Sequence, residues 1–180
     1  MSNHYDSIIS STFEKDFFYG KGSERTVYQI NHHINQFNQR YPDLARNLLS
    51  ALKAYFPSAT IEDHTQFFNN DRCIRFLLQL SSTERYVLQV SIFEAFSVYK
   101  RSFKIENGRY YYDEVKFINN GESPICDKAF KCLPVECQNF TWLDRQTLEK
   151  TIPQFSVMEK EPSLSYIVKV AGVLFTTHYI

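Results

Sequence analysis

The chain has 180 residues, of which 43% are hydrophobic, and its 20 basic residues are balanced by 20 acidic ones. This apolar content is enough for the core of one domain, so we expect a single domain over residues 1–180. The zero net charge excludes an overall field that would attract nucleic acid or an anionic membrane, and we expect neither as a partner.

Two amphipathic helices are predicted near the start of the chain. Residues 1–22 are expected to form a short helix or an arm that docks through aromatic side chains. Ser23 is a suitable N-cap for a helix over 24–39. The expected buried stripe of that helix recurs at steps of three and four residues: Val27, Ile30, Ile34 and Phe37.

A second helix is predicted after Pro42, because leucines follow at helical spacing until Pro57 terminates the pattern. Residues 23–57 should therefore form a helical hairpin. From Ile61 the hydrophobic period changes to two, which predicts an antiparallel sheet over 60–118.

The sheet is predicted to be a meander of runs at 73–80, 85–105 and 109–118. The middle run has about 20 residues, several times the usual length of a strand. Glu94 interrupts its alternation, so we expect a bulge or a bend near 93–95.

Asn107-Gly108 is the strongest local signal, because this pair favours a type I′ turn with a two-residue loop. Such a loop fixes the register of the flanking strands. Glu106 then faces Arg109, and Phe103 faces Tyr112. The same register places Arg101 opposite Glu114, an attractive cross-strand pair.

The last third of the chain gives weaker signals. Residues 119–140 are predicted to be an irregular loop with one helical turn near 127–132. Thr141 and Asp144 have the spacing of a capping box, which predicts a short helix that stops before Pro153. The apolar run 163–180 fits a strand or a helix, and we favour a strand.

No catalytic or metal motif is present in the sequence. Three of the four cysteines, Cys126, Cys132 and Cys137, lie close together, but their spacing is too wide for a structural zinc site. No secretory signal precedes them, so we expect a cytoplasmic protein with reduced thiols and with no metal or cofactor. His32 and His33 lie on one helix about 100° apart, which favours one boundary and one solvated ring.

These observations predict an α+β fold, in which an N-terminal helical hairpin packs on an antiparallel sheet of four or more strands. A late short helix and a C-terminal strand complete it. The aromatic and arginine residues of the hairpin favour protein binding, since Tyr and Arg are common in interface hot spots. The predicted contact residues are Tyr99, Arg101, Tyr110, Tyr112 and Glu114.

We therefore expect a soluble protein-binding module without catalytic activity, of the inhibitor, immunity or adaptor type. Its partner would be another protein. Packing of the same aromatic face under the helices would equally explain its composition. Two other functions remain open: a small enzyme with a cysteine or histidine site, and a binder of small ligands in an aromatic cavity.

Overall fold

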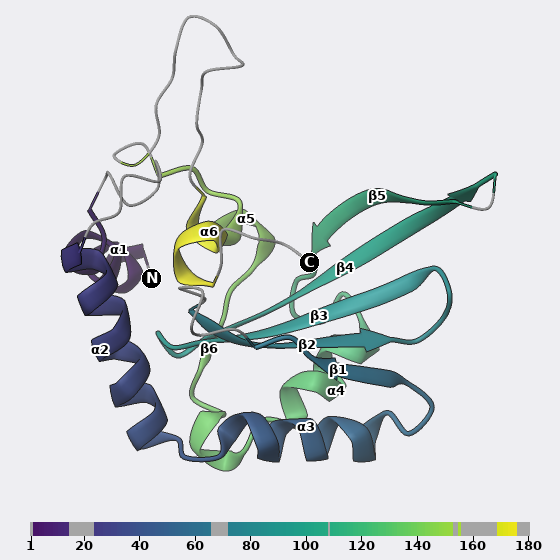
Figure 1. Cartoon of the computed structure of the whole chain (residues 1–180), viewed down its shortest axis with the longest axis horizontal. Helices are drawn as coiled ribbons and strands as arrows, with labels where there is room; N and C mark the ends of the chain where they lie inside the picture. Colours follow the sequence, from purple (N-terminus) through teal and green to yellow (C-terminus); the bar gives the residue numbers. More distant parts are fainter. Residues whose placement is uncertain are drawn as a thin grey trace, which may run out of the picture.

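The computed structural model describes residues 2–14, 24–65, 72–107, 109–152, 155 and 169–175. Helices lie on both sides of a mostly antiparallel sheet (Figure 1). The predicted α+β fold, with N-terminal helices packed on an antiparallel sheet, is confirmed. Within these ranges, no helix is both long and apolar enough to cross a membrane.

Three helices precede the sheet in the part of the chain that the structure describes. α1 (Ser2–Thr12) docks through the buried side chains of Tyr5 and Ile9, and Phe13 follows it into the core. α2 (Glu24–Arg40) buries the predicted stripe, except that Val27 is only half-buried. The predicted N-cap of α2, Ser23, lies outside the described residues.

α3 (Leu44–Tyr55) buries Leu44, Leu48 and Leu52 and ends before Pro57, as the leucine pattern predicts. α2 and α3 meet at a corner, where Asp43 adopts a left-handed conformation with φ of 63° (Figure 1). Asp tolerates this conformation better than most residues, which lets the chain turn sharply into α3.

Five antiparallel strands follow in spatial order: β1 (Thr60–Asp63), β2 (Cys73–Gln79), β3 (Glu84–Ser91), β4 (Ala95–Glu106) and β5 (Arg109–Phe117). A sixth strand, β6 (Thr141–Trp142), pairs in parallel with the start of β4. α3 and α4 lie on one side of the sheet and α6 on the other (Figure 1). Both faces of the central strands are therefore covered, so β2 is buried continuously from Cys73 to Leu78 instead of alternating.

The long run predicted at 85–105 is two strands, and the prediction of one strand with a bulge or a bend is wrong. The chain reverses at Ile92, Phe93 and Glu94, and Val90 pairs with Phe96 across the turn. Glu94 has φ of 57°, the left-handed conformation that closes a three-residue hairpin loop. Glycine or asparagine is common at such a position. Because glutamate occupies it here, the sequence pattern did not predict the turn.

The Asn107-Gly108 hairpin forms, but its predicted register holds only near the turn. Four pairs follow the prediction, from Glu106 with Arg109 to Phe103 with Tyr112. The register then shifts by one residue, so that Glu114 pairs with Ser102 and Val115 pairs with Arg101. The predicted facing of Arg101 and Glu114 is wrong, because a bulge at Asp113 adds one residue to β5.

Short helices make up much of the described part of the last third of the chain. α4 (Pro124–Lys131) starts at Ser123, whose hydroxyl accepts the Ile125 N–H. A 3-10 turn, η3, covers Val135–Cys137. The helical turn predicted near 127–132 thus lies within a longer helix that begins earlier.

Two predictions in this region need correction. Thr141 does not cap a helix, because it belongs to β6, and Asp144 is the N-cap of α5 (Arg145–Leu148). The predicted C-terminal strand is wrong over Val170–Leu174, which form α6, although Lys169 makes an isolated antiparallel bridge with Thr151. The rest of the run 163–180, apart from Lys169 and Phe175, lies outside the described residues.

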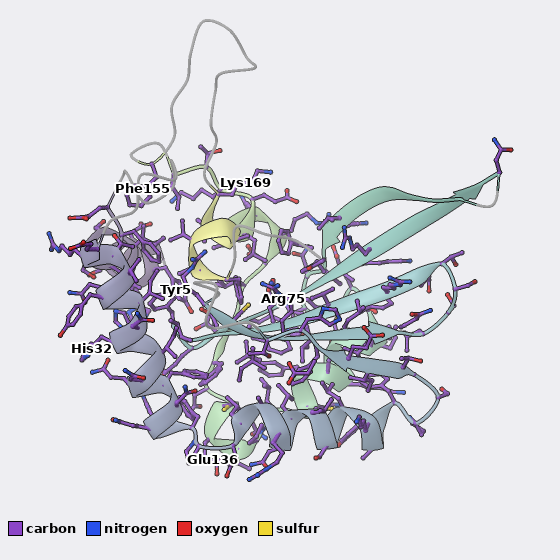
Figure 2. The ribbon with its side chains drawn as sticks, in the orientation of Figure 1. Tyr5, His32, Arg75, Glu136, Phe155 and Lys169 are labelled. Atoms are coloured by element: carbon purple, nitrogen blue, oxygen red, sulfur yellow. The ribbon has the colours of Figure 1, made fainter. Side chains whose placement is uncertain are left out.

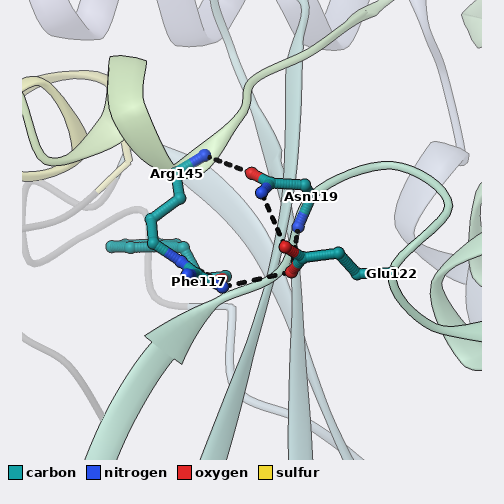
Figure 3. A network of polar contacts seen from close by, with 4 residues as sticks. All are labelled: Phe117, Asn119, Glu122 and Arg145. Carbon is teal, nitrogen blue, oxygen red and sulfur yellow. Dashed lines mark hydrogen bonds and ion pairs between the residues drawn. The ribbon is translucent and has the colours of Figure 1, made fainter.

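The end of β5 is tied to α5 by one polar network (Figure 3). Arg145 Nε donates to the carbonyl of Phe117 at 2.8 Å, and its Nη2 lies 3.1 Å from the Glu122 carboxylate. Asn119 joins the same carboxylate and accepts the Arg145 backbone N–H at 2.8 Å. The carbonyl of Phe117 therefore already accepts a hydrogen bond from Arg145. This contact disfavours the addition of another strand at this end of β5.

Candidate functional site

A two-stranded ribbon, residues 103–112, projects from the sheet (Figure 1). β3 pairs with β4 only as far as Glu84 with Ser102. The pairing of β4 with β5 continues four pairs further, to Glu106 with Arg109. Along this ribbon, β4 and β5 pair only with each other, and no third strand among the described residues pairs with either edge.

The structure separates the five predicted contact residues. Tyr99 is fully buried and packs edge-on against Phe117, with ring centroids 5.8 Å apart. Arg101 is half-buried at the base of the ribbon. Tyr110 and Tyr112 are ribbon positions, paired with Ile105 and Phe103, whereas Glu114 lies below the ribbon opposite Ser102. The role of all five in binding stays a prediction. The proposal below keeps Arg101, Tyr110 and Tyr112, and it leaves out Tyr99, which is buried, and Glu114, which lies outside the ribbon.

Glu94 is a second candidate, because a strained backbone often marks a functional residue. Its carboxylate accepts from Arg40 Nη1 at 2.5 Å and from the Tyr41 hydroxyl at 2.9 Å. Its carbonyl accepts the backbone N–H of Thr141 at 3.0 Å. One residue thus joins the end of α2, the β3–β4 turn and the start of β6.

The chemistry around Glu94 is that of a structural joint. Burial, and then the hydrogen bond to Glu94, raises the pKa of Tyr41 to about 12. A phenol with that pKa stays protonated near neutral pH, so Tyr41 holds the carboxylate as a donor and does not act as a base. Two small hollows flank this joint, of about 280 and 190 Å³, and Arg40 and Tyr41 line both.

Substitutions at Glu94 should separate backbone strain from the carboxylate contacts. Both Glu94→Ala and Glu94→Gly lose the bonds to Arg40 and Tyr41, but only glycine is free of the left-handed penalty. We expect Glu94→Gly to be more stable than Glu94→Ala by about 1 kcal/mol in urea denaturation. An alanine variant as stable as the glycine variant would show that the turn stores no strain.

The two adjacent histidines differ as predicted. His32 is exposed on the outer side of α2, away from the sheet (Figure 2). His33 is half-buried, with Nε2 3.3 Å from Thr12 Oγ1 and its ring 5.2 Å from that of Phe93. Burial, and then the neighbouring His32, lowers the pKa of His33. His33 therefore joins α1 to α2 in its neutral form.

Acid should weaken the protein through His33. Because the pKa of His33 is lower in the folded chain than its unfolded value of about 6.5, the unfolded chain takes up the proton first. The stabilisation is complete above about pH 6.5 and is lost as the pH falls from there toward the folded pKa. Between about pH 7.5 and 5, the melting temperature should fall less with pH for His33→Gln than for wild type. The melting temperature of His32→Gln should keep most of the wild-type dependence on pH.

The four cysteines are free and buried. Burial raises the pKa of Cys126 and Cys137 to about 12 and that of Cys132 to about 11. In the described part of the chain, no cluster of metal-ligating side chains is present. These surroundings stabilise the thiol over the reactive thiolate.

All four thiols should therefore react slowly with a disulfide reagent in the native protein. We expect rates at least about 100-fold below that of free cysteine at pH 8, and full reaction in urea. A single thiol that reacts at the ordinary rate would contradict this and would favour the cysteine-enzyme alternative.

A larger hollow was not predicted from the sequence. Its volume is about 480 Å³, and its walls come from α1 and from residues 141–150. These two segments are far apart in the chain, and only the fold brings them together. No local pattern in either segment marks it as half of a cavity.

Comparisons with protein-family models, with curated proteins and with solved structures give no match. The function must therefore be inferred from the geometry of this chain.

Proposed function

We propose that this chain is a protein-binding module, and that the ribbon 103–112 with Arg101 at its base is its contact surface. The observation that carries the proposal is the continued pairing of β4 and β5 beyond the end of β3. A two-stranded ribbon without a third neighbour is only marginally stable in water. Packing against a partner protein would supply the missing neighbour.

The composition of the ribbon supports the same function. Tyr110, Tyr111 and Tyr112 are consecutive on β5. Tyrosine combines a large contact area with a hydroxyl donor and is enriched in the hot spots of interfaces. An inhibitor, immunity or adaptor protein would use such a projecting element to reach into a partner.

The edge of β5 favours side-chain contacts over addition of a strand. The bulge at Asp113 breaks the even spacing of the outward backbone groups, and Arg145 occupies the carbonyl of Phe117. Both features oppose strand-to-strand pairing along the edge. We therefore expect the partner to contact the side chains of the ribbon.

A shortened hairpin tests the proposal without touching the core. Because Ser102 pairs with Glu114, deletion of 103–106 and 109–113 leaves Asn107-Gly108 as a two-residue loop between paired residues. The deletion removes the bulge and the ribbon together. We expect folding with a free energy of unfolding within about 1 kcal/mol of wild type, since the deleted pairs lie beyond β3.

The partner would be isolated from native lysate on the full chain and then titrated against each variant. We expect the shortened hairpin to lose binding and Tyr112→Ala to weaken it at least about tenfold. Tyr28→Ala, which removes an exposed tyrosine of α2, is the matched control and should bind normally. A partner that binds the shortened hairpin at full affinity would remove the ribbon from the proposal.

A further inference from the structure

The hollow of about 480 Å³ lies between α1, the β6–α5 segment and the start of α6. Its size is within the range of small-molecule sites, about 300–1,000 Å³. A second hollow of about 320 Å³ adjoins it, because Asp6, Ile9, Lys150 and Val170 line both. Residues of α1 and α6 line both hollows. These two helices lie at the other end of the sheet from the ribbon (Figure 1).

The floor of the larger hollow is apolar. Ile9, Leu143 and Val170 line it and are all buried. Tyr5 extends from α1 toward α6 and closes the same floor (Figure 2). Such a floor favours an apolar group of matching size, because its burial removes hydrocarbon surface from water.

The rim carries both signs of charge. Asp6 and Lys150 line the hollow, and both are exposed. Neither side chain makes a hydrogen bond or an ion pair with any other residue that the structure describes, and they do not pair with each other. Asp144 also lines the rim, but its carboxylate already accepts the Thr147 N–H at 2.7 Å as the N-cap of α5.

This arrangement discriminates between classes of ligand. A simple carboxylic acid would meet the carboxylate of Asp6, and a simple amine would meet the ammonium of Lys150. A molecule with both charges satisfies both groups through charge-assisted hydrogen bonds. Its apolar side chain would fill the floor that Ile9 and Val170 form.

We propose that this hollow binds a small zwitterion with an apolar side chain, the chemistry of an apolar α-amino acid. The ligand ammonium lies at Asp6 and its carboxylate at Lys150. This site is independent of the proposed protein-binding ribbon, so the failure of either proposal leaves the other standing.

Calorimetric titration with L-phenylalanine and L-leucine tests the site on the full chain. We expect saturable binding with a dissociation constant below about 10 mM. Phenethylamine and 3-phenylpropanoate, which each lack one charge, should bind at least about tenfold more weakly than L-phenylalanine. Equal binding of either analogue would overturn the proposal, as would no binding of either amino acid.

Variants locate the two charges. Asp6→Asn and Lys150→Gln should each weaken L-phenylalanine binding at least about tenfold. Asp43→Asn and Lys53→Gln make the same chemical changes on exposed positions of the α2–α3 region and should bind as wild type does. Thr147→Phe, which fills the hollow from its rim, should abolish binding in a protein with an unchanged circular dichroism spectrum. Full affinity in that variant would place the ligand elsewhere.

Discussion

Replacement of Arg72 by methionine should lower the free energy of unfolding by about 3 kcal/mol or more, the largest loss that we expect from a polar residue. Arg72 is 1% exposed and lies immediately before β2. Its Nε donates to the carbonyl of Val173 and its Nη2 to that of Gly172, each at 2.6 Å. Its backbone N–H donates to Phe175.

These bonds fasten α6 to the sheet. The last carbonyls of a helix have no partner within the helix. In α6, the guanidinium of Arg72 donates hydrogen bonds to two of them inside the protein. Methionine has a similar length but no donor, so two buried carbonyls would lose their partners at about 1–3 kcal/mol each. The guanidinium also stacks 5.6 Å from the centre of the Phe13 ring, so α1 should loosen with α6.

Urea denaturation followed by circular dichroism would measure this loss. Arg46→Met is the matched control, because Arg46 is exposed on α3 and its ion pair with Asp43 lies on the surface. That pair should contribute less than about 1 kcal/mol. An Arg72→Met protein as stable as the control would show that other contacts hold α6 in place.

Arg72 also explains why the strand prediction for the C-terminal run is wrong. The residues Val170, Val173 and Leu174 are compatible with either structure when only their hydrophobicity is considered. The deciding interactions come from Arg72 and Ser91, whose hydroxyl donates to the Leu174 carbonyl at 2.5 Å. Both donors are about 80 or more residues away in the chain, so no local pattern contains them.

Local signals were reliable where local chemistry determines the structure. The stripes of α2 and α3 and the Asn107-Gly108 turn follow directly from helical spacing and turn preference. The register of the hairpin changes at Asp113, because one extra residue on β5 has no signature in alternating side chains. As a result, Glu114 lies opposite Ser102 and not opposite Arg101.

The candidate sites depend on long-range contacts even more strongly than the fold does. Glu94 has no feature of a turn residue, and its role depends on Arg40 and Tyr41 from the α2–α3 corner. The hollow under α1 requires Asp6 and Lys150 on one rim. Sequence reasoning identifies such residues as surface charges, and only their placement distinguishes them from other exposed acids and lysines.

A second large loss is expected at Phe96, where an aromatic cluster joins the sheet to α4 and β6. Phe96 is fully buried on β4, and its ring centroid lies 5.4 Å from that of Phe130 and 5.0 Å from that of Trp142. Phe96→Ala removes a ring that touches two others in a closely packed region. We expect a loss of about 3–5 kcal/mol from the lost burial and the cavity left behind.

Phe96→Leu separates the cost of the cavity from the loss of ring contacts. Leucine fills most of the space, so its cost should be about 1–1.5 kcal/mol. The chain has 1 tryptophan, so fluorescence during urea denaturation reports on this cluster directly. Trp142 emission in native Phe96→Ala should shift toward the red as the ring gains mobility and contact with water, while native Phe96→Leu should keep the wild-type emission. Equal stabilities for the two variants would mean that the sheet closes the cavity by relaxation, and that β6 and α4 are held to β4 by other contacts.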